Sequence, residues 1–83
     1  MFYARKRDEE LTRVQAEARK KLDQGQGKFM VPMSLLPTKL NLAYVREMKQ
    51  MATDAMEEMG LSVTDIKDGD SQYQVTLLVE RFG

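Results

Sequence analysis

Hydrophobic residues recur at helical spacing in two segments of this chain. The first segment, from about Ala4 to Gln24, has one narrow apolar stripe among many charged residues. The stripe repeats every three or four positions and consists of Leu11, Val14, Ala18 and Leu22. Gly25 and Gly27 follow, and glycine readily adopts the left-handed geometry that ends a helix. The pattern predicts an N-terminal charged helix that ends in a glycine-rich turn.

The second helical segment, from about Asn41 to Met59, carries four of the seven methionines of the chain. Either Thr38 or Asn41 can cap its first turn. Its main apolar face consists of Val45, Met48, Ala52, Met56 and Met59, and a shoulder beside this face consists of Tyr44, Met51 and Ala55. An ordinary surface helix has one apolar stripe and a polar back. The wider arc therefore predicts two contacts for this helix, one with a sheet and one with the first helix or a partner.

Short segments of a different pattern predict three strands. Lys28–Met33 has one apolar side, and Pro32, which has no N–H to donate, makes it an edge strand or a bent one. Beyond the second helix the period changes to two, in a segment that begins at Leu61 and in a longer one at Gln72–Phe82. The Asp68–Gly69 pair between them favours a tight hairpin turn. In the last strand, one side is formed by Tyr73, Val75, Leu77 and Val79, and we expect the helix methionines to pack on it.

These elements predict one α+β domain in α-β-α-β-β order. A small three-stranded sheet with a C-terminal β-hairpin is expected to carry the central helix on one face. Residues 1–27 form the charged helix and the glycine-rich turn, and residues 28–83 form the β-α-β-β core. In topology only, this order resembles that of Alba-like chromatin and RNA-binding proteins without their first strand. That resemblance implies a function in nucleic-acid binding.

Composition and charge are those of a small soluble domain. The 83 residues are 42% hydrophobic and 31% charged, with no cysteine, which excludes disulfides and thiolate metal sites. A core of this size is marginal, and oligomerisation is a common reinforcement. We find no apolar segment of the length of a membrane span or a signal peptide, which favours a cytoplasmic location. Residues 1–28 hold eight Lys/Arg against five Asp/Glu, whereas residues 29–83 hold five against eight.

The sequence lacks most residues that catalysis and metal binding use. It has no histidine and no cysteine, so the usual general base and the best nucleophile are missing. Asp65, Asp68 and Asp70 cluster at the hairpin turn but do not have the spacing of a calcium loop. Gly25–Lys28 does not have the spacing of a phosphate-binding loop. We therefore expect no enzymatic activity, no metal and no cofactor.

The apolar surface instead predicts protein binding. The narrow stripe of the first helix is typical of a helix pair, and methionine is enriched on adaptable binding surfaces. We expect a self-associating module, a homodimer, that acts as an adaptor, regulator or inhibitor of a larger protein. The contact would use the first helix or an exposed strand edge, either the first strand or Gln72–Phe82. The interface candidates are Leu11, Val14, Ala18, Leu22, Tyr44, Met51 and Ala55.

A second hypothesis is nucleic-acid binding by the basic first third of the chain. The candidate residues are Arg5, Lys6, Arg7, Arg19, Lys20, Lys21 and Lys28. The isoelectric point of about 6.2 is low for a nucleic-acid-binding domain. Acidic residues are also interleaved with the basic ones, so no single basic stripe forms on the helix. The sequence favours the protein-binding hypothesis over this one.

Overall fold

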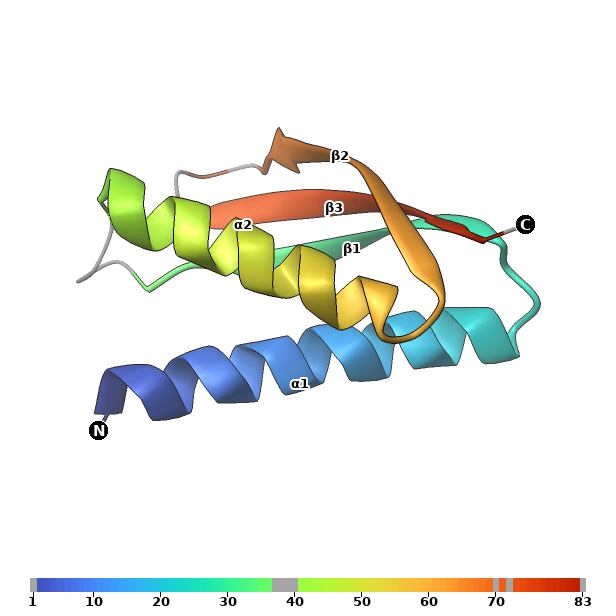
Figure 1. Cartoon of the computed structure of the whole chain (residues 1–83), viewed down its shortest axis with the longest axis horizontal. Coiled ribbons are helices and arrows are strands. Elements are labelled where there is room, and N and C mark those ends of the chain that lie inside the picture. Colours follow the sequence, from blue (N-terminus) through green and yellow to red (C-terminus); the bar gives the residue numbers. More distant parts are fainter. Residues whose placement is uncertain (1, 37–40, 70, 72, 83) are drawn as a thin grey trace.

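The computed structural model describes residues 2–36, 41–69, 71 and 73–82, and it confirms the predicted α+β fold (Figure 1). Two helices and three strands follow one another in the order α1 (Phe2–Asp23), β1 (Lys28–Ser34), α2 (Leu42–Glu57), β2 (Leu61–Asp68) and β3 (Gln74–Arg81). Most element boundaries lie within a few residues of those predicted, because caps and glycines mark them in the sequence.

Local chemistry explains where the helices end. The Asn41 side chain accepts a hydrogen bond from the backbone N–H of Tyr44 at 2.9 Å and so caps the first turn of α2. The other predicted cap, Thr38, lies outside the described residues. Gly25 follows α1 with a φ of 84°, and Gly60 follows α2 with a φ of 78°. Both angles lie in the left-handed region, where glycine pays no side-chain penalty.

The sheet is antiparallel, with the strand order β1-β3-β2. The C-terminal strand β3 is therefore the central strand and pairs on both sides. The expectation that Gln72–Phe82 offers an exposed edge is wrong for this reason. The two edges of the sheet belong to β1 and β2, and Pro32 lies in an edge strand as predicted.

Both helices pack on one face of the sheet (Figure 1). The largest fully buried side chains come from all five elements and are Val14, Val31, Met33, Met48, Met56, Leu61, Leu77 and Val79. Burying a side chain of this size stabilises the fold by roughly 1.5–3 kcal/mol. The methionines Met48 and Met56 thus pack in the core, as expected of the central helix. Tyr73 does not join them, because it precedes β3 and is 41% exposed.

The hairpin between β2 and β3 explains why residue 69 is a glycine. Gly69 donates its N–H to the carbonyl oxygen of Gln74 at 2.9 Å. A Cβ atom at position 69 would lie 2.9 Å from that same oxygen. This close approach requires a residue without a side chain at position 69, whereas the left-handed backbone for which Asp-Gly is favoured in two-residue turns is not found at Gly69.

Candidate interaction surface

A row of charged side chains on α1 occupies the outer edge of β1. Hydrogen bonds alternate along an antiparallel strand, so the backbone groups of Met30, Pro32 and Ser34 point away from β3. Lys21 donates to the carbonyl of Met30, and Arg13 donates to the carbonyl of Pro32 at 2.7 Å. The N–H of Ser34 donates to Glu10 at 2.7 Å. Pro32 has no N–H, but the missing donor belongs on this outer side, so no bond to β3 is lost.

Ion pairs fix this row in place. Arg13 donates two hydrogen bonds to the carboxylate of Glu10, at 3.0 and 2.7 Å. The bond to Glu10 raises the pKa of Arg13 above its ordinary value, so the guanidinium stays charged. Lys21 lies 3.7 Å from Glu17 and 5.8 Å from the ring centroid of Phe29. The outer edge of β1 is therefore closed by side chains of the same chain.

We expect Glu10→Ala to lower the free energy of unfolding by about 1–2 kcal/mol, because it removes a charged acceptor from both Arg13 and the Ser34 N–H. The Glu10 side chain is only 17% exposed, so water replaces it poorly. The matched control is Glu9→Ala, since Glu9 is 58% exposed and pairs with Arg5 at 3.6 Å. The free energy of unfolding of both variants is measured by urea denaturation, with circular dichroism as the signal. Equal losses for the two variants would contradict this role of Glu10.

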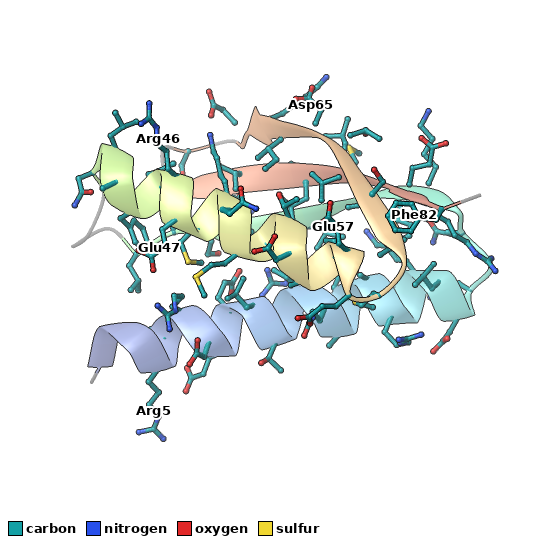
Figure 2. The ribbon with its side chains drawn as sticks, in the orientation of Figure 1. Arg5, Arg46, Glu47, Glu57, Asp65 and Phe82 are labelled. Carbon is teal, nitrogen blue, oxygen red and sulfur yellow. The ribbon has the colours of Figure 1, made fainter. Side chains whose placement is uncertain are left out.

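The opposite edge, on β2, is protected in a different way. The pairing with β3 shifts between Val63 and Asp65, which marks a β-bulge at this point. Asp65, Lys67 and Asp68 are exposed beyond the bulge, and Figure 2 shows Asp65 pointing away from the body of the protein. Bulges and charges are features that natural sheets use against edge-to-edge pairing. Neither edge of the sheet is thus a simple template for an added strand.

The face of the sheet turned away from the helices is not covered by α1 or α2. In β3 the residues Val75, Leu77 and Val79 are buried towards the helices, so their alternating neighbours lie on the other face. The register places these outer residues in cross-strand rows: Lys28–Glu80–Ser62, Met30–Leu78–Asp65, Pro32–Thr76–Lys67 and Ser34–Gln74. The two middle rows hold the apolar side chains on β1 and β3, and each of these rows ends in a charged residue on β2, Asp65 or Lys67.

The middle of this face is apolar and hollowed. Met30 is 58% exposed, although it lies directly opposite the half-buried Leu78. A hollow of about 480 Å³ lies beside this pair, lined by Lys21, Gln26, Lys28, Phe29, Met30, Thr64, Leu78 and Val79. An exposed apolar centre with a charged rim is the arrangement found at protein interfaces.

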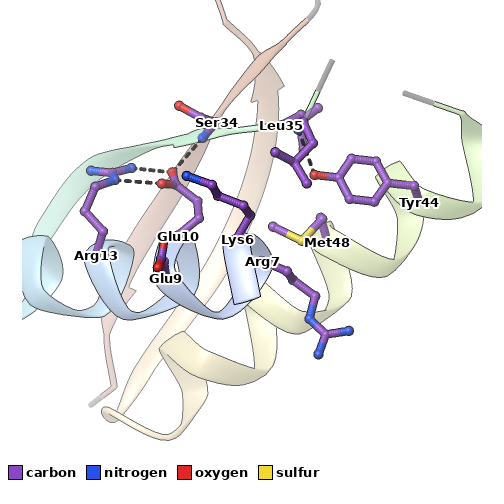
Figure 3. Close-up of a pocket in the computed structure, with 10 residues that line it drawn as sticks. Lys6, Arg7, Glu9, Glu10, Arg13, Ser34, Leu35, Tyr44 and Met48 are labelled. Atoms are coloured by element: carbon purple, nitrogen blue, oxygen red, sulfur yellow. Dashed lines mark hydrogen bonds and ion pairs between the residues drawn. The ribbon is translucent and has the colours of Figure 1, made fainter. Parts of the chain in front are cut away.

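A second hollow, of about 330 Å³, lies between the first half of α1, the end of β1 and the start of α2 (Figure 3). Its polar groups are engaged within the chain. Glu10 binds Arg13 and Ser34, and the Tyr44 hydroxyl accepts a hydrogen bond from the N–H of Leu36 at 2.8 Å. Arg7 points away from Glu10 and Tyr44 in Figure 3. Its guanidinium lies 3.2 Å from the carboxylate of Glu47. These contacts hold α1 against the end of β1 and the start of α2.

Most of the predicted interface residues lie inside the domain. Val14 and Ala18 are fully buried, and Tyr44 and Ala55 are at most 8% exposed. Leu11 and Leu22 are partly buried against the same core, and Met51 is half-buried. The expected seam on α1 is therefore a contact with α2 and β1, which leaves these side chains little area for a partner. The second contact predicted for the wide apolar arc of α2 is therefore made by helix α1 of the same chain.

The predicted nucleic-acid residues are not gathered into one basic surface. Lys21 and Arg7 lie in ion pairs with Glu17 and Glu47. Arg5 points away from the body of the domain next to Glu9 (Figure 2). Lys28 lies on the uncovered sheet face, whereas Arg19 and Lys20 are exposed on the last turns of α1, and Lys6 borders the second hollow.

Sequence reasoning missed the residues of the uncovered face. Its centre consists of Met30, Pro32, Thr76 and Leu78. One signal was present: Leu78 is an apolar residue at a position where the alternation of the last strand calls for a polar one. Met30 could not be distinguished from its neighbours, because Phe29–Met33 is almost uniformly apolar.

Comparison of the chain with protein-family models, with curated proteins and with solved structures gives no match. Within the described residues, neither helix is long and apolar enough to cross a membrane. The same part of the chain has no group of three acidic, histidine or cysteine side chains placed to hold a metal ion.

Proposed function

We propose that this chain is a small, non-enzymatic protein-binding module of the cytoplasm that acts as an adaptor, regulator or inhibitor. The observation that carries the proposal is the uncovered sheet face, where Met30 and Leu78 form an apolar centre beside a hollow. Large apolar side chains exposed together mark interaction sites more often than isolated ones do. Because both strand edges are protected, we place the partner on this face.

The chemistry of this face favours protein over nucleic acid. Lys28 and Lys67 are balanced by Asp65 and Glu80, so the rows carry no excess positive charge to attract phosphates. The described residues of the rows include no aromatic side chain on which a base can stack. Tyr73 and Phe82, although exposed, flank β3 instead of lying in these rows.

The proposal is tested by placing a photo-crosslinking amino acid at position 30, in the centre of the face. The matched control carries the same group in place of Lys20, which is exposed on α1. We expect position 30 to give discrete crosslinked protein products and position 20 to give none of them. Leu78→Lys should abolish these products, because it places a charge in the apolar centre.

Two results would overturn the proposal. One is equal labelling from both positions, which indicates random collision. The other is labelling from position 30 that survives Leu78→Lys in a chain that circular dichroism shows to be folded.

A further inference from the structure

We infer that the uncovered sheet face binds a second copy of this chain, through a two-fold axis that runs across the strands between the two middle rows. This inference rests on the proposed function and names the partner. In such a dimer each row of one copy lies over a different row of the other. The row Met30–Leu78–Asp65 meets the row Pro32–Thr76–Lys67 of the second copy.

The charges on β2 select this arrangement. A two-fold axis across the strands keeps each strand opposite its own copy and reverses the order of the rows. Asp65 then faces Lys67 of the second copy, and Lys67 faces Asp65 of the second copy. The two contacts are identical by symmetry, so one pair of residues supplies two ion pairs at the rim.

Other two-fold placements are less favourable. An axis that passes through the row of Leu78 places Asp65 against Asp65 of the second copy, and like charges repel. An axis that runs along β3 places Asp65 over Met30 and Lys67 over Pro32, so each charge is set against an apolar group. Of these three axes, the one between the middle rows pairs both the charges and the apolar groups.

The apolar groups also match under this axis. Met30 lies over Pro32 of the second copy, and Leu78 lies over Thr76 of the second copy. The hollow of about 480 Å³ beside Met30 and Leu78 faces this Pro32–Thr76 pair. Aligned sheets pack about 10 Å apart, a spacing at which side chains from two such faces interdigitate.

The small area of the face indicates a weak dimer. Three strands about 4.8 Å apart and about 26 Å long give a footprint of roughly 350–400 Å² per copy. Specific, stable complexes bury about 800 Å² per partner, so this interface belongs with the weak and transient ones. We therefore expect a dissociation constant of roughly 10–500 µM, with rapid exchange between monomer and dimer.

The inference is tested by charge exchange at the two rim positions, with sedimentation equilibrium at concentrations up to about 1 mM. We expect Lys67→Asp and Asp65→Lys each to weaken the dimer at least about tenfold, because each puts like charges in contact. The double variant Asp65→Lys/Lys67→Asp should restore it. Mixing the two single variants should also restore association, since one copy then carries two cations and the other two anions.

Matched controls are Lys20→Asp and Glu57→Lys, which change the same charges at exposed positions of the helices. They should leave the dissociation constant unchanged. Asp65 accepts a hydrogen bond from the N–H of Ile66 at 2.8 Å, so Asp65→Lys also disturbs the bulge. Lys67→Asp avoids this bond, and its comparison with the double variant decides the matter if Asp65→Lys alone is unfolded.

A natural chain that is monomeric at 1 mM overturns the inference, as do single variants that dimerise normally or fail to associate when mixed. The crosslinking experiment separates this failure from failure of the proposed function. Products at about twice 9.6 kDa indicate self-association. Products of other masses that Leu78→Lys abolishes, from a chain that is monomeric, leave the binding function standing and remove only the second copy as partner.

Discussion

We expect Val14→Asp to leave the chain largely unfolded at about 25 °C. Val14 is fully buried in the centre of α1, where its side chain meets the core formed by α2 and the sheet. A carboxylate at this position has no partner, and burying it costs several kcal/mol. A domain of 83 residues has a total stability of about 4–12 kcal/mol. The substitution therefore consumes most of the free energy that holds the fold.

The matched control is Ala16→Asp, which introduces the same carboxylate at an exposed position of α1. We expect this variant to stay folded, with a loss of at most about 1 kcal/mol from helix propensity. Circular dichroism and the dispersion of amide proton resonances measure both variants. A folded Val14→Asp protein with altered self-association would show instead that α1 leaves the core and forms an intermolecular helix pair.

We expect Met56→Ala to lower the free energy of unfolding by about 2–5 kcal/mol, the range found when a large core side chain is truncated to alanine. Met56 is fully buried on the side of α2 that faces the sheet, and its removal leaves a cavity that the neighbouring side chains fill only in part. Met30→Ala is the matched control from the uncovered face. Because Met30 is 58% exposed, its truncation should change stability by no more than about 0.5 kcal/mol.

Urea denaturation measures the two methionine variants side by side. Equal losses would contradict the assignment of one methionine to the core and the other to the open face. The two variants also separate stability from association, since Met30→Ala should weaken the proposed dimer while leaving the fold intact. Met56→Ala should instead destabilise the fold and leave the proposed dimer intact, under conditions in which the variant remains folded.

The element order and the buried face of α2 could be predicted because both depend on residues that are close together in the sequence. Asn41 and Gly60 mark the ends of α2, and the spacing of Met48 and Met56 marks the face that it buries. The hairpin turn at Gly69 is equally local. These features depend on residues within a few positions of one another, which is the range over which sequence patterns are informative.

The strand order could not be predicted, because it depends on contacts between distant segments. The alternation of Gln74–Arg81 has the same form in an edge strand as in a central one, and only pairing with both β1 and β2 decides. The same holds for Glu10 and Arg13. In the sequence, both residues have the pattern of ordinary charged residues on a helix surface. They bind the edge of β1 only because β1 lies beside α1 in the fold.

The predicted interface could not be distinguished from core for a related reason. Leu11, Val14, Ala18 and Leu22 form a stripe that fits a partner helix or the chain's own core equally well, since both are apolar surfaces. The structure places the stripe in the core and leaves an apolar centre at Met30 and Leu78 instead. Two apolar residues from different strands have no shared sequence pattern, so only the cross-strand register reveals them.

The row of α1 side chains along β1 has a consequence for folding. α1 and β1 are joined by a short turn, so their contact forms between neighbouring parts of the sequence. Pairing of β1 with β3 must instead close a loop of roughly forty to fifty residues, and it is the slower event. Before β1 pairs with β3, one of the two edges of β1 can already be occupied by the side chains of Lys21, Arg13 and Glu10. We therefore expect the N-terminal helix to shield an apolar strand from other chains during the interval in which aggregation competes with folding.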